Sequence, residues 1–254
     1  MLRRTLGSVA LLALAFAVIA TPANATLIQA GVGQSGAGVD VNFQAELTIS
    51  GDILTLRLLN LSDQSLNPAD LLASYYFDIV NSGGVRPTLT YVSATGDVYL
   101  THKNAPDALL TASANLRAVN PGDNTWEFLA FDPALNPFYG FGVGTVGNSN
   151  LTPNNFHGNI VDGQDYAIYA GDATTQNLAE RTLVLLGPVT FTFSGVAGFT
   201  EADIARTCLF GMGTAPDSLL QGQTTSGAPP SIPEPATVAL LALGGLALIC
   251  RRRK

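Results

Sequence analysis

The stretch VNFQAELTISGDILTLRLL, residues 41–59, decides the fold class. Apolar and polar residues alternate over 41–49 and again over 54–58, which is the pattern of strands with one buried face. The tripeptide SGD at 50–52 separates the two segments and supplies a short glycine-containing turn. The stretch therefore predicts an antiparallel β-hairpin.

Shorter segments continue this pattern along the chain. Further strands are predicted over 75–80, 88–92, 97–100, 125–131, 166–169, 183–186 and 189–194. Asn67 before Pro68, and Thr200 before Glu201, predict the starts of two short helices. Because longer helical periodicity is missing from the sequence, we expect an all-β fold. The predicted form is a single antiparallel β-sandwich or jelly-roll-like domain with short helices.

The N-terminus has the three parts of a secretory signal peptide. Arg3 and Arg4 precede an apolar segment over 9–20, and Ala23 and Ala25 form a small-x-small site. This order predicts a signal peptide that is removed after Ala25. The chain is therefore expected to be exported through the general secretion machinery.

The C-terminus combines a proline-containing tripeptide, an apolar run and a basic end. The run 236–250 would form a helix of about 22 Å, shorter than the roughly 30 Å hydrocarbon core, and is predicted to be a transmembrane helix. The basic residues 251–254 are expected to stay cytoplasmic. This orientation places Pro233, Glu234 and Pro235 at the outer face. The two prolines favour extended backbone, so the helix is not expected to continue back through the tripeptide.

These three parts together resemble the PEP-CTERM sorting signal of bacterial envelope proteins. The resemblance covers about a tenth of the chain, namely Pro233, Glu234, Pro235, the run 236–250, Arg251, Arg252, Arg253 and Lys254. It implies that exosortase, a membrane enzyme, recognises the tripeptide, cuts close to it and passes the protein to the envelope or to extracellular polymer. The alternative is an ordinary single-pass anchor with a proline-rich stalk.

The N-terminal and C-terminal signals define the boundaries of the domain and linker that lie between them. We predict a signal peptide at 1–25, a β-rich exported domain at 26–220, a flexible linker at 221–232 and a sorting signal at 233–254. The linker is inferred from a shift to Gly, Thr, Ser and Pro. About 200 residues then remain for the exported part, which suits one domain.

The exported part is strongly acidic. The whole chain has a formal net charge of −7, but residues 26–233 contain six basic and eighteen acidic residues, a net charge of −12. Such a surface disfavours nucleic acid and anionic lipid as partners. Cys208 is the one cysteine of this part and Cys250 lies in the tail, so an intradomain disulfide is excluded. Cys208 is expected to be a buried, inert side chain.

Two ligand classes have candidate residues. Aromatic and asparagine side chains interleave with glycines over 136–169, a composition suited to sugars, although long connections of β domains share it. Asp162, Asp165 and Asp172 could supply oxygen ligands to Ca²⁺, but they lack the full EF-hand pattern, and Asp-Gly pairs are also ordinary turns. We therefore expect no cofactor and keep Ca²⁺ as an alternative.

Catalytic motifs find little support. Residues 142–147 match G-x-G-x-x-G, but the polar residues that follow cannot open the helix that a dinucleotide site needs, so a glycine-rich loop or bulged strand is expected. Neither His102 nor His157 lies in a recognisable catalytic motif. We expect no enzyme, while acidic residues leave a glycan-active hydrolase open.

The sequence thus predicts an exported cell-surface or extracellular-matrix protein. Its expected role is structural or adhesive, linked to exopolysaccharide or biofilm, with exosortase as a partner and transient anchoring in the inner membrane. The alternatives are a carbohydrate- or calcium-binding lectin-like module and a tethered polysaccharide hydrolase.

Overall fold

A computed structural model describes residues 25–65, 67–101, 106–117, 125–132, 139–145, 166–171, 183–213 and 218–225. These residues belong to one compact unit, Asn24–Gly227. The strands are β1 (Leu27–Gln34), β2 (Asp40–Ser50), β3 (Ile53–Asn60), β4 (Leu72–Phe77), β5 (Thr90–Leu100), β6 (Ala108–Asn115), β7 (Glu127–Ala130), β8 (Phe141–Gly144), β9 (Ile168–Tyr169), β10 (Leu183–Ser194), β11 (Thr207–Met212) and β12 (Leu219–Thr224). Two 3₁₀ turns, η1 (Pro68–Asp70) and η3 (Glu201–Asp203), stand at the predicted helix starts. The all-β class is confirmed.

β2 and β3 form the predicted hairpin. Buried and half-buried residues alternate along β2 between its two exposed ends, as the sequence pattern requires. Ser50 pairs with Ile53, so Gly51 and Asp52 make a two-residue turn. Gly51 has φ of +62° and Asp52 does not have positive φ, as in a type II′ turn. The hairpin register places the apolar side chains of both strands on one face.

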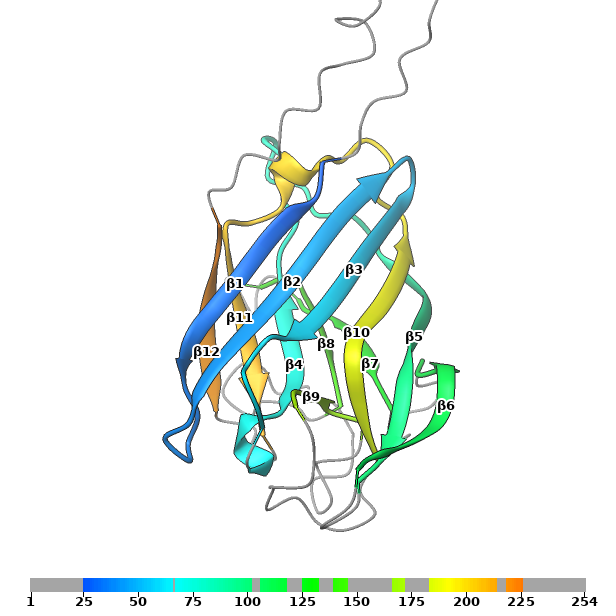
Figure 1. Cartoon of the computed structure of the whole chain (residues 1–254). Helices are drawn as coiled ribbons and strands as arrows, with labels where there is room; N and C mark the ends of the chain where they lie inside the picture. The colour runs from blue at the N-terminus through cyan, green and yellow to red at the C-terminus, as the bar shows by residue number, and fades with distance from the viewer. Residues whose placement is uncertain are drawn as a thin grey trace, which may run out of the picture. The chain divides into compact units, whose positions relative to one another are not determined.

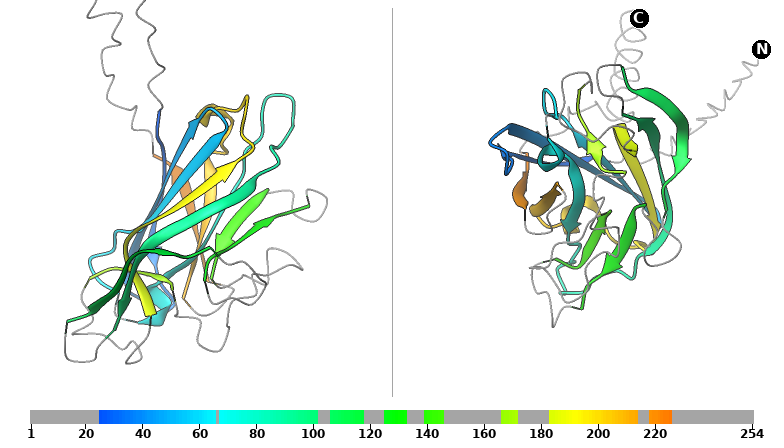
Figure 2. Two further views of the ribbon diagram at one scale, coloured as in Figure 1. Left: turned by 90° about the vertical axis from the view of Figure 1, so that its right-hand side faces the viewer. Right: turned by 90° about the horizontal axis from the view of Figure 1, so that it is seen from below.

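The strands form one continuous sheet that closes into a ring of eight (Figures 1 and 2). The order around the ring is β10-β3-β2-β1-β12-β11-β4-β9, and β9 returns to β10. Ile168 of β9 pairs with Leu72 of β4 on one side and with Leu185 of β10 on the other. β5 and β6 extend the sheet beyond β10, and β8 and β7 extend it beyond β4.

The ring corrects the predicted sandwich or jelly-roll-like arrangement. A sandwich consists of two packed sheets, whereas here β9 joins the two sides of a single sheet. β9 is only two residues long and pairs with β10 in the parallel sense. So short a strand has no periodicity of its own, which is why the sequence pattern did not show the closure.

β10 pairs with β9 over one part of its length and with β3 over another, because a bulge divides it. Its pairing with β5 shifts register between Leu186 and Thr190, and Gly187 adopts φ of +83° in between. Before the bulge β10 pairs with β9, and after it β10 pairs with β3. Pro188 is tolerated there because a bulge interrupts the ladder of hydrogen bonds. The two strands predicted over 183–186 and 189–194 are therefore one.

The inside of the ring is filled by aliphatic side chains together with large aromatic rings. The largest buried rings there are those of Phe43, Tyr75, Phe77, Trp126, Phe191, Phe193 and Phe210. Trp126 meets Phe191 edge-on with a centroid separation of 5.1 Å. Burying one large apolar side chain stabilises a fold by about 1.5–3 kcal/mol. This core holds the domain together without a disulfide, since Cys208 is a free buried cysteine.

An ion pair between Asp78 and Arg86 stabilises the segment that follows β4. Arg86 donates from Nε to Asp78 Oδ1 at 2.8 Å and from Nη2 to Asp78 Oδ2 at 2.7 Å. Asp78 Oδ1 also accepts from the Ile79 N–H at 2.9 Å. A Cβ on Gly140 would come within 2.5 Å of Asp78 Oδ1, so this close approach requires glycine. The hydrogen bond and charge of Asp78 raise the pKa of Arg86 further.

Several predicted boundaries change. β1, β6, β11 and β12 were not predicted as strands, and β5 joins the two segments predicted over 88–92 and 97–100. β12 ends at Thr224, so the linker predicted at 221–232 begins too early. The signal peptide up to residue 24, the sorting segment 233–254 and its run 236–250 lie outside the described residues. Within the described ranges no helix is both long and apolar enough to cross a bilayer.

Candidate functional site

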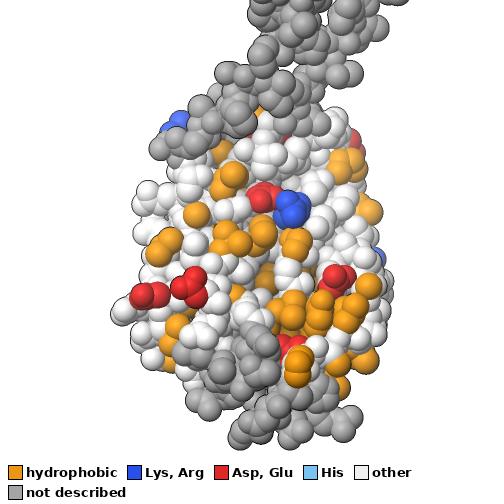
Figure 3. Space-filling model, viewed as in Figure 1, with side chains coloured by type: hydrophobic (Ala, Val, Ile, Leu, Met, Phe, Trp, Pro, Cys, Tyr) orange, Lys and Arg blue, Asp and Glu red, His pale blue; other side chains and the backbone are white. Residues whose placement is uncertain are grey.

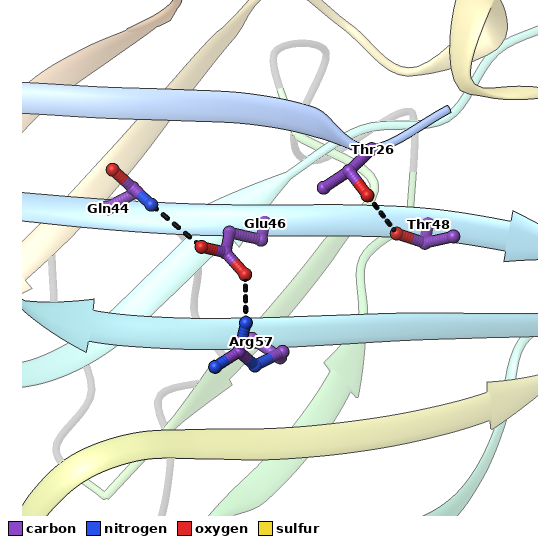
Figure 4. A network of polar contacts seen from close by, with 5 residues as sticks. All are labelled: Thr26, Gln44, Glu46, Thr48 and Arg57. Atoms are coloured by element: carbon purple, nitrogen blue, oxygen red, sulfur yellow. Dashed lines mark hydrogen bonds and ion pairs between the residues drawn. The ribbon is translucent and has the colours of Figure 1, made fainter. Parts of the chain in front are cut away.

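The outward face of the ring carries a row of hydroxyl side chains. Directly paired residues share a face of a sheet, so the strand register fixes this row. Thr48 pairs with Thr55, and Thr55 pairs with Thr192. Ser93 of β5 follows opposite Thr192. Thr26 completes the row, because its Oγ1 lies 3.0 Å from Oγ1 of Thr48 (Figure 4).

A second row lies next to the first and contains the two charged residues of the face. Glu46 pairs with Arg57, whose Nη1 donates to Glu46 Oε2 (Figure 4). Gln44 Nε2 donates to the other carboxylate oxygen, Oε1, at 2.9 Å. Thr190 and Thr95 continue the row on β10 and β5. Because the acid and the base pair with each other, the row has no net charge.

A third row extends the pattern towards the hairpin turn. Ser50 pairs with Ile53, Ile53 with Ser194, and Ser194 with Thr90. The three rows together present ten hydroxyl side chains: Thr26, Thr48, Ser50, Thr55, Thr90, Ser93, Thr95, Thr190, Thr192 and Ser194. We call these ten residues the hydroxyl face.

The hydroxyl face is a broad hydrogen-bonding surface. Each hydroxyl can donate one hydrogen bond and accept two. Neighbouring strands are about 4.8 Å apart and alternate residues of one strand about 6.8 Å apart, so the hydroxyls form a regular grid. The three rows contain no aromatic side chain, so a ligand there would be held by hydrogen bonds rather than by stacking. The sequence analysis missed this face, although Thr190-x-Thr192 beside the alternating β2 and β3 was its signal.

Cys208 is buried in the core, as predicted. Burial raises the pKa of its thiol to about 12, against smaller opposing effects from hydrogen bonds with Tyr75 and Gly222. A Cβ on Gly222 would come within 2.5 Å of Cys208 Sγ, which shows how closely the neighbouring strand packs. At neutral pH the thiol is protonated, so it is not an activated nucleophile.

The first glycine of the 142–147 motif has a packing role. Gly142 and Gly144 lie in β8, where both are buried. A Cβ on Gly142 would lie 2.9 Å from Tyr76 Cδ1 and 3.1 Å from Phe131 Cζ. Glycine is therefore required for close approach of two aromatic rings, as one of the two sequence interpretations proposed. Gly147 lies outside the described residues.

Most of the other predicted site residues lie outside the described part of the chain. This holds for Ala23, for Pro233, Glu234 and Pro235, for Arg251 to Lys254, for the calcium candidates Asp162, Asp165 and Asp172, and for His102 and His157. Ala25 is the first described residue and is exposed. Among the side chains that the structure describes, no group of three or more His, Cys, Asp or Glu residues could hold a metal ion.

Comparison with models of protein families identifies a known motif in the C-terminal segment. A model of the PEP-CTERM protein-sorting motif matches residues 231–254. The chain carries a PEP-CTERM sorting motif. This match confirms the resemblance found in the tripeptide, the apolar run and the basic end. The motif implies exosortase as the processing partner, and an exported protein that is transiently anchored in the membrane.

The exported domain itself has no such counterpart. Neither a curated protein nor a solved structure matches the chain. The PEP-CTERM motif covers only the C-terminal segment, so it addresses sorting and leaves the role of the ring open. Any function of the ring must be argued from its own surface.

Proposed function

We propose that this protein is an exported surface or extracellular-matrix protein whose ring domain binds exopolysaccharide. Its role is structural or adhesive, in the cell envelope or in a biofilm, and exosortase sorts and processes it. The PEP-CTERM motif supports the sorting part of this proposal. The hydroxyl face supports the polysaccharide part.

The width and the neutrality of the hydroxyl face carry the proposal. Its central row crosses five neighbouring segments of the sheet, from Thr26 to Ser93. A polysaccharide is an extended polymer that carries hydroxyl groups along its length, so it can exchange hydrogen bonds with many positions of such a grid. Small-molecule sites are concave instead. The pairing of Glu46 with Arg57 keeps the face neutral on an otherwise acidic domain.

The proposed role is binding rather than catalysis. The protonated thiol of Cys208 supports this view. The hydroxyls of the face are not accompanied in their rows by a histidine that could activate them. Cofactor-free binding is the simplest function consistent with these residues.

We further propose an order of events at the membrane. The signal peptide is removed after Ala25, and the run 236–250 holds the precursor in the inner membrane. The basic residues 251–254 stay on the cytoplasmic side because cations are costly to translocate. This topology presents Pro233-Glu234-Pro235 to exosortase on the outer side, where the chain is cut.

The sorting proposal is tested on the full chain in cells that contain exosortase. Mass spectrometry of the protein at its final location should show a C-terminus close to residue 233, without residues 251–254. Glu234→Ala should leave unprocessed precursor in the membrane. An intact basic end on the exported protein, or normal processing of Glu234→Ala, would contradict the proposal.

The binding proposal is tested by co-sedimentation with exopolysaccharide from the same cells. Thr55→Val with Thr192→Val keeps side-chain shape and removes two central hydroxyls. A hydrogen bond contributes about 0.5–1.5 kcal/mol, so the double variant should bind about tenfold more weakly. Thr207→Val on β11 is the control, because its side chain is exposed outside the hydroxyl face. Equal binding by both variants would refute a role for the face.

A calcium-binding, lectin-like module is the second candidate. Its support is the acidic group Asp162, Asp165 and Asp172, whose carboxylates suit Ca²⁺. Calcium should then raise the melting temperature, and Asp162→Asn with Asp165→Asn should remove that rise. A hydrolase tethered by the same tail would instead shorten the polysaccharide chains.

A further inference from the structure

The hydroxyl face carries one cation, and that cation is already paired. Glu46 and Arg57 are the charged residues of its three rows, and Arg57 Nη1 donates to Glu46 Oε2. Gln44 Nε2 donates to the other carboxylate oxygen of Glu46 at 2.9 Å. Figure 3 shows one blue group in the middle of this face, directly beside a red one, and the other blue groups at the outline of the view. The guanidinium of the rows is therefore neutralised within the face.

The other arginines that the structure describes lie elsewhere. Arg86 is paired with Asp78 in the segment that follows β4. Arg117 lies over the Tyr91 ring, with its Cζ 5.5 Å from the ring centre. Arg206 is exposed just before β11, which β12 and β1 separate from β2. Within the described ranges, the hydroxyl face thus has no unpaired cation to offer to a ligand.

Two carboxylates border the hydroxyl face. Asp52 lies in the turn between Ser50 and Ile53 of the third row. Asp97 lies two positions after Thr95 on β5, which puts it on the same face about 6.8 Å away. This spacing is shorter than the Debye length of about 8 Å in physiological salt, so the charge of Asp97 acts on a ligand at Thr95. The border of the face is therefore negative.

Hydroxyl groups without free cations suit an uncharged ligand. A sugar hydroxyl donates and accepts, as each Thr and Ser of the face does, so the two sets can exchange hydrogen bonds in either direction. A carboxylate only accepts, and taking it out of water without a cationic partner is costly. The exported part, with six basic and eighteen acidic residues at 26–233, also repels polyanions before contact.

We infer that the hydroxyl face selects an uncharged polysaccharide and excludes polysaccharides that carry carboxylate groups. This inference rests on the proposed function and specifies the chemical class of its ligand. The central row, from Thr26 to Ser93, crosses five neighbouring segments of the sheet, a span of about 19 Å at about 4.8 Å per strand. The occupant is therefore a stretch of polymer rather than a single sugar, and its binding does not depend on ion pairs.

Fractionated exopolysaccharide tests this selection. Anion exchange separates the exopolysaccharide of the producing cells into an uncharged and an acidic fraction. Co-sedimentation of the exported protein is then measured with each fraction in EDTA, which prevents bridging by divalent cations. The uncharged fraction should bind at least about tenfold more tightly, because a desolvated carboxylate would lack a cation. Raising the salt concentration should leave this binding almost unchanged, since no ion pair is screened.

The outcomes separate this inference from the proposed function. Thr55→Val with Thr192→Val should weaken binding of the uncharged fraction, which assigns that binding to the hydroxyl face. Equal or tighter binding of the acidic fraction, or binding that is lost as salt is raised, would overturn the inference and leave the proposed function standing. Binding of neither fraction would refute both.

A charge variant tests the cause of the selection. Glu46→Gln keeps the size of the side chain and leaves Arg57 without its carboxylate, so the acidic fraction should bind about two- to fivefold more tightly. Asp40→Asn is the matched control, because it removes one negative charge from the same strand about 20 Å from Glu46, well beyond the Debye length. It should leave binding of the acidic fraction as weak as before. Equal binding of the acidic fraction by the two variants would overturn the inference.

Discussion

The ion pair between Asp78 and Arg86 should contribute far more to stability than the pair between Glu46 and Arg57. The side chain of Asp78 is 7% exposed and that of Arg86 is 21% exposed. Arg86→Met therefore leaves a carboxylate with little access to water. Breaking a fully buried pair costs about 3–5 kcal/mol. Because Arg86 is partly exposed, we expect about 2–3 kcal/mol.

Arg57→Met is the matched control on the outer face. Its side chain is 43% exposed and that of Glu46 is 21% exposed, so water screens this pair. Pairs of this kind contribute up to about 1 kcal/mol. The two substitutions remove the same charge and add the same side chain, which leaves burial of the pair as the main difference between them.

Urea unfolding followed by Trp126 fluorescence measures both variants. For a slope of about 2–3 kcal/mol per molar urea, Arg86→Met should lower the unfolding midpoint by about 1 M. Arg57→Met should lower it by less than about 0.5 M. If the two midpoints fall equally, burial of Asp78 is not what makes the pair stabilising, and the reasoning fails.

Three other changes test the packing of the core. Gly142→Ala brings a Cβ to 2.9 Å from Tyr76 Cδ1 and should cost about 1–3 kcal/mol in a thermal melt; an unchanged melting temperature would show that the ring simply moves aside. Gly195→Ala should cost more, about 3 kcal/mol or above, since φ is +102° and the Cβ would lie 2.1 Å from the Thr88 carbonyl oxygen; soluble, fully folded protein would contradict this. Burial raises the pKa of Cys208 to about 12, so the unfolded chain loses this proton first and stability should fall as pH rises from about 9 to about 12. Cys208→Ala should flatten that decline in pH-dependent unfolding, and an unchanged slope would assign it to other groups.

Local patterns predicted the parts of the fold that depend on local chemistry. The hairpin of β2 and β3 followed from alternation and from Gly51, and η1 followed from Asn67 before Pro68. In η1 the Asn67 N–H donates to Asp70 Oδ2 at 2.9 Å, a contact within four residues. Such features depend on neighbours in the sequence, so the sequence alone can indicate them.

Features that depend on distant partners were not predictable in the same way. β6 was missed because its small and exposed residues show no alternation, and β1 and β12 were missed because glycines interrupt theirs. Gly31 and Gly33 of β1 lie against Phe210 and Leu220, where a Cβ would come closer than 3.0 Å. Close packing against strands that come later in the sequence therefore requires glycine at these two positions. The hydroxyl face likewise exists only once the register of the strands is set.

The pairing of β1 with β12 has a consequence for the order in which the ring can close. Thr225 N–H bonds to the Ile28 carbonyl oxygen, across 197 positions of the chain. Until β12 is in place, one edge of β1 has no neighbour, and the ring is incomplete. Contacts of such long separation form late and slowly. A chain that ends before residue 219 would therefore keep one edge of β1 unpaired, however well its other strands had formed.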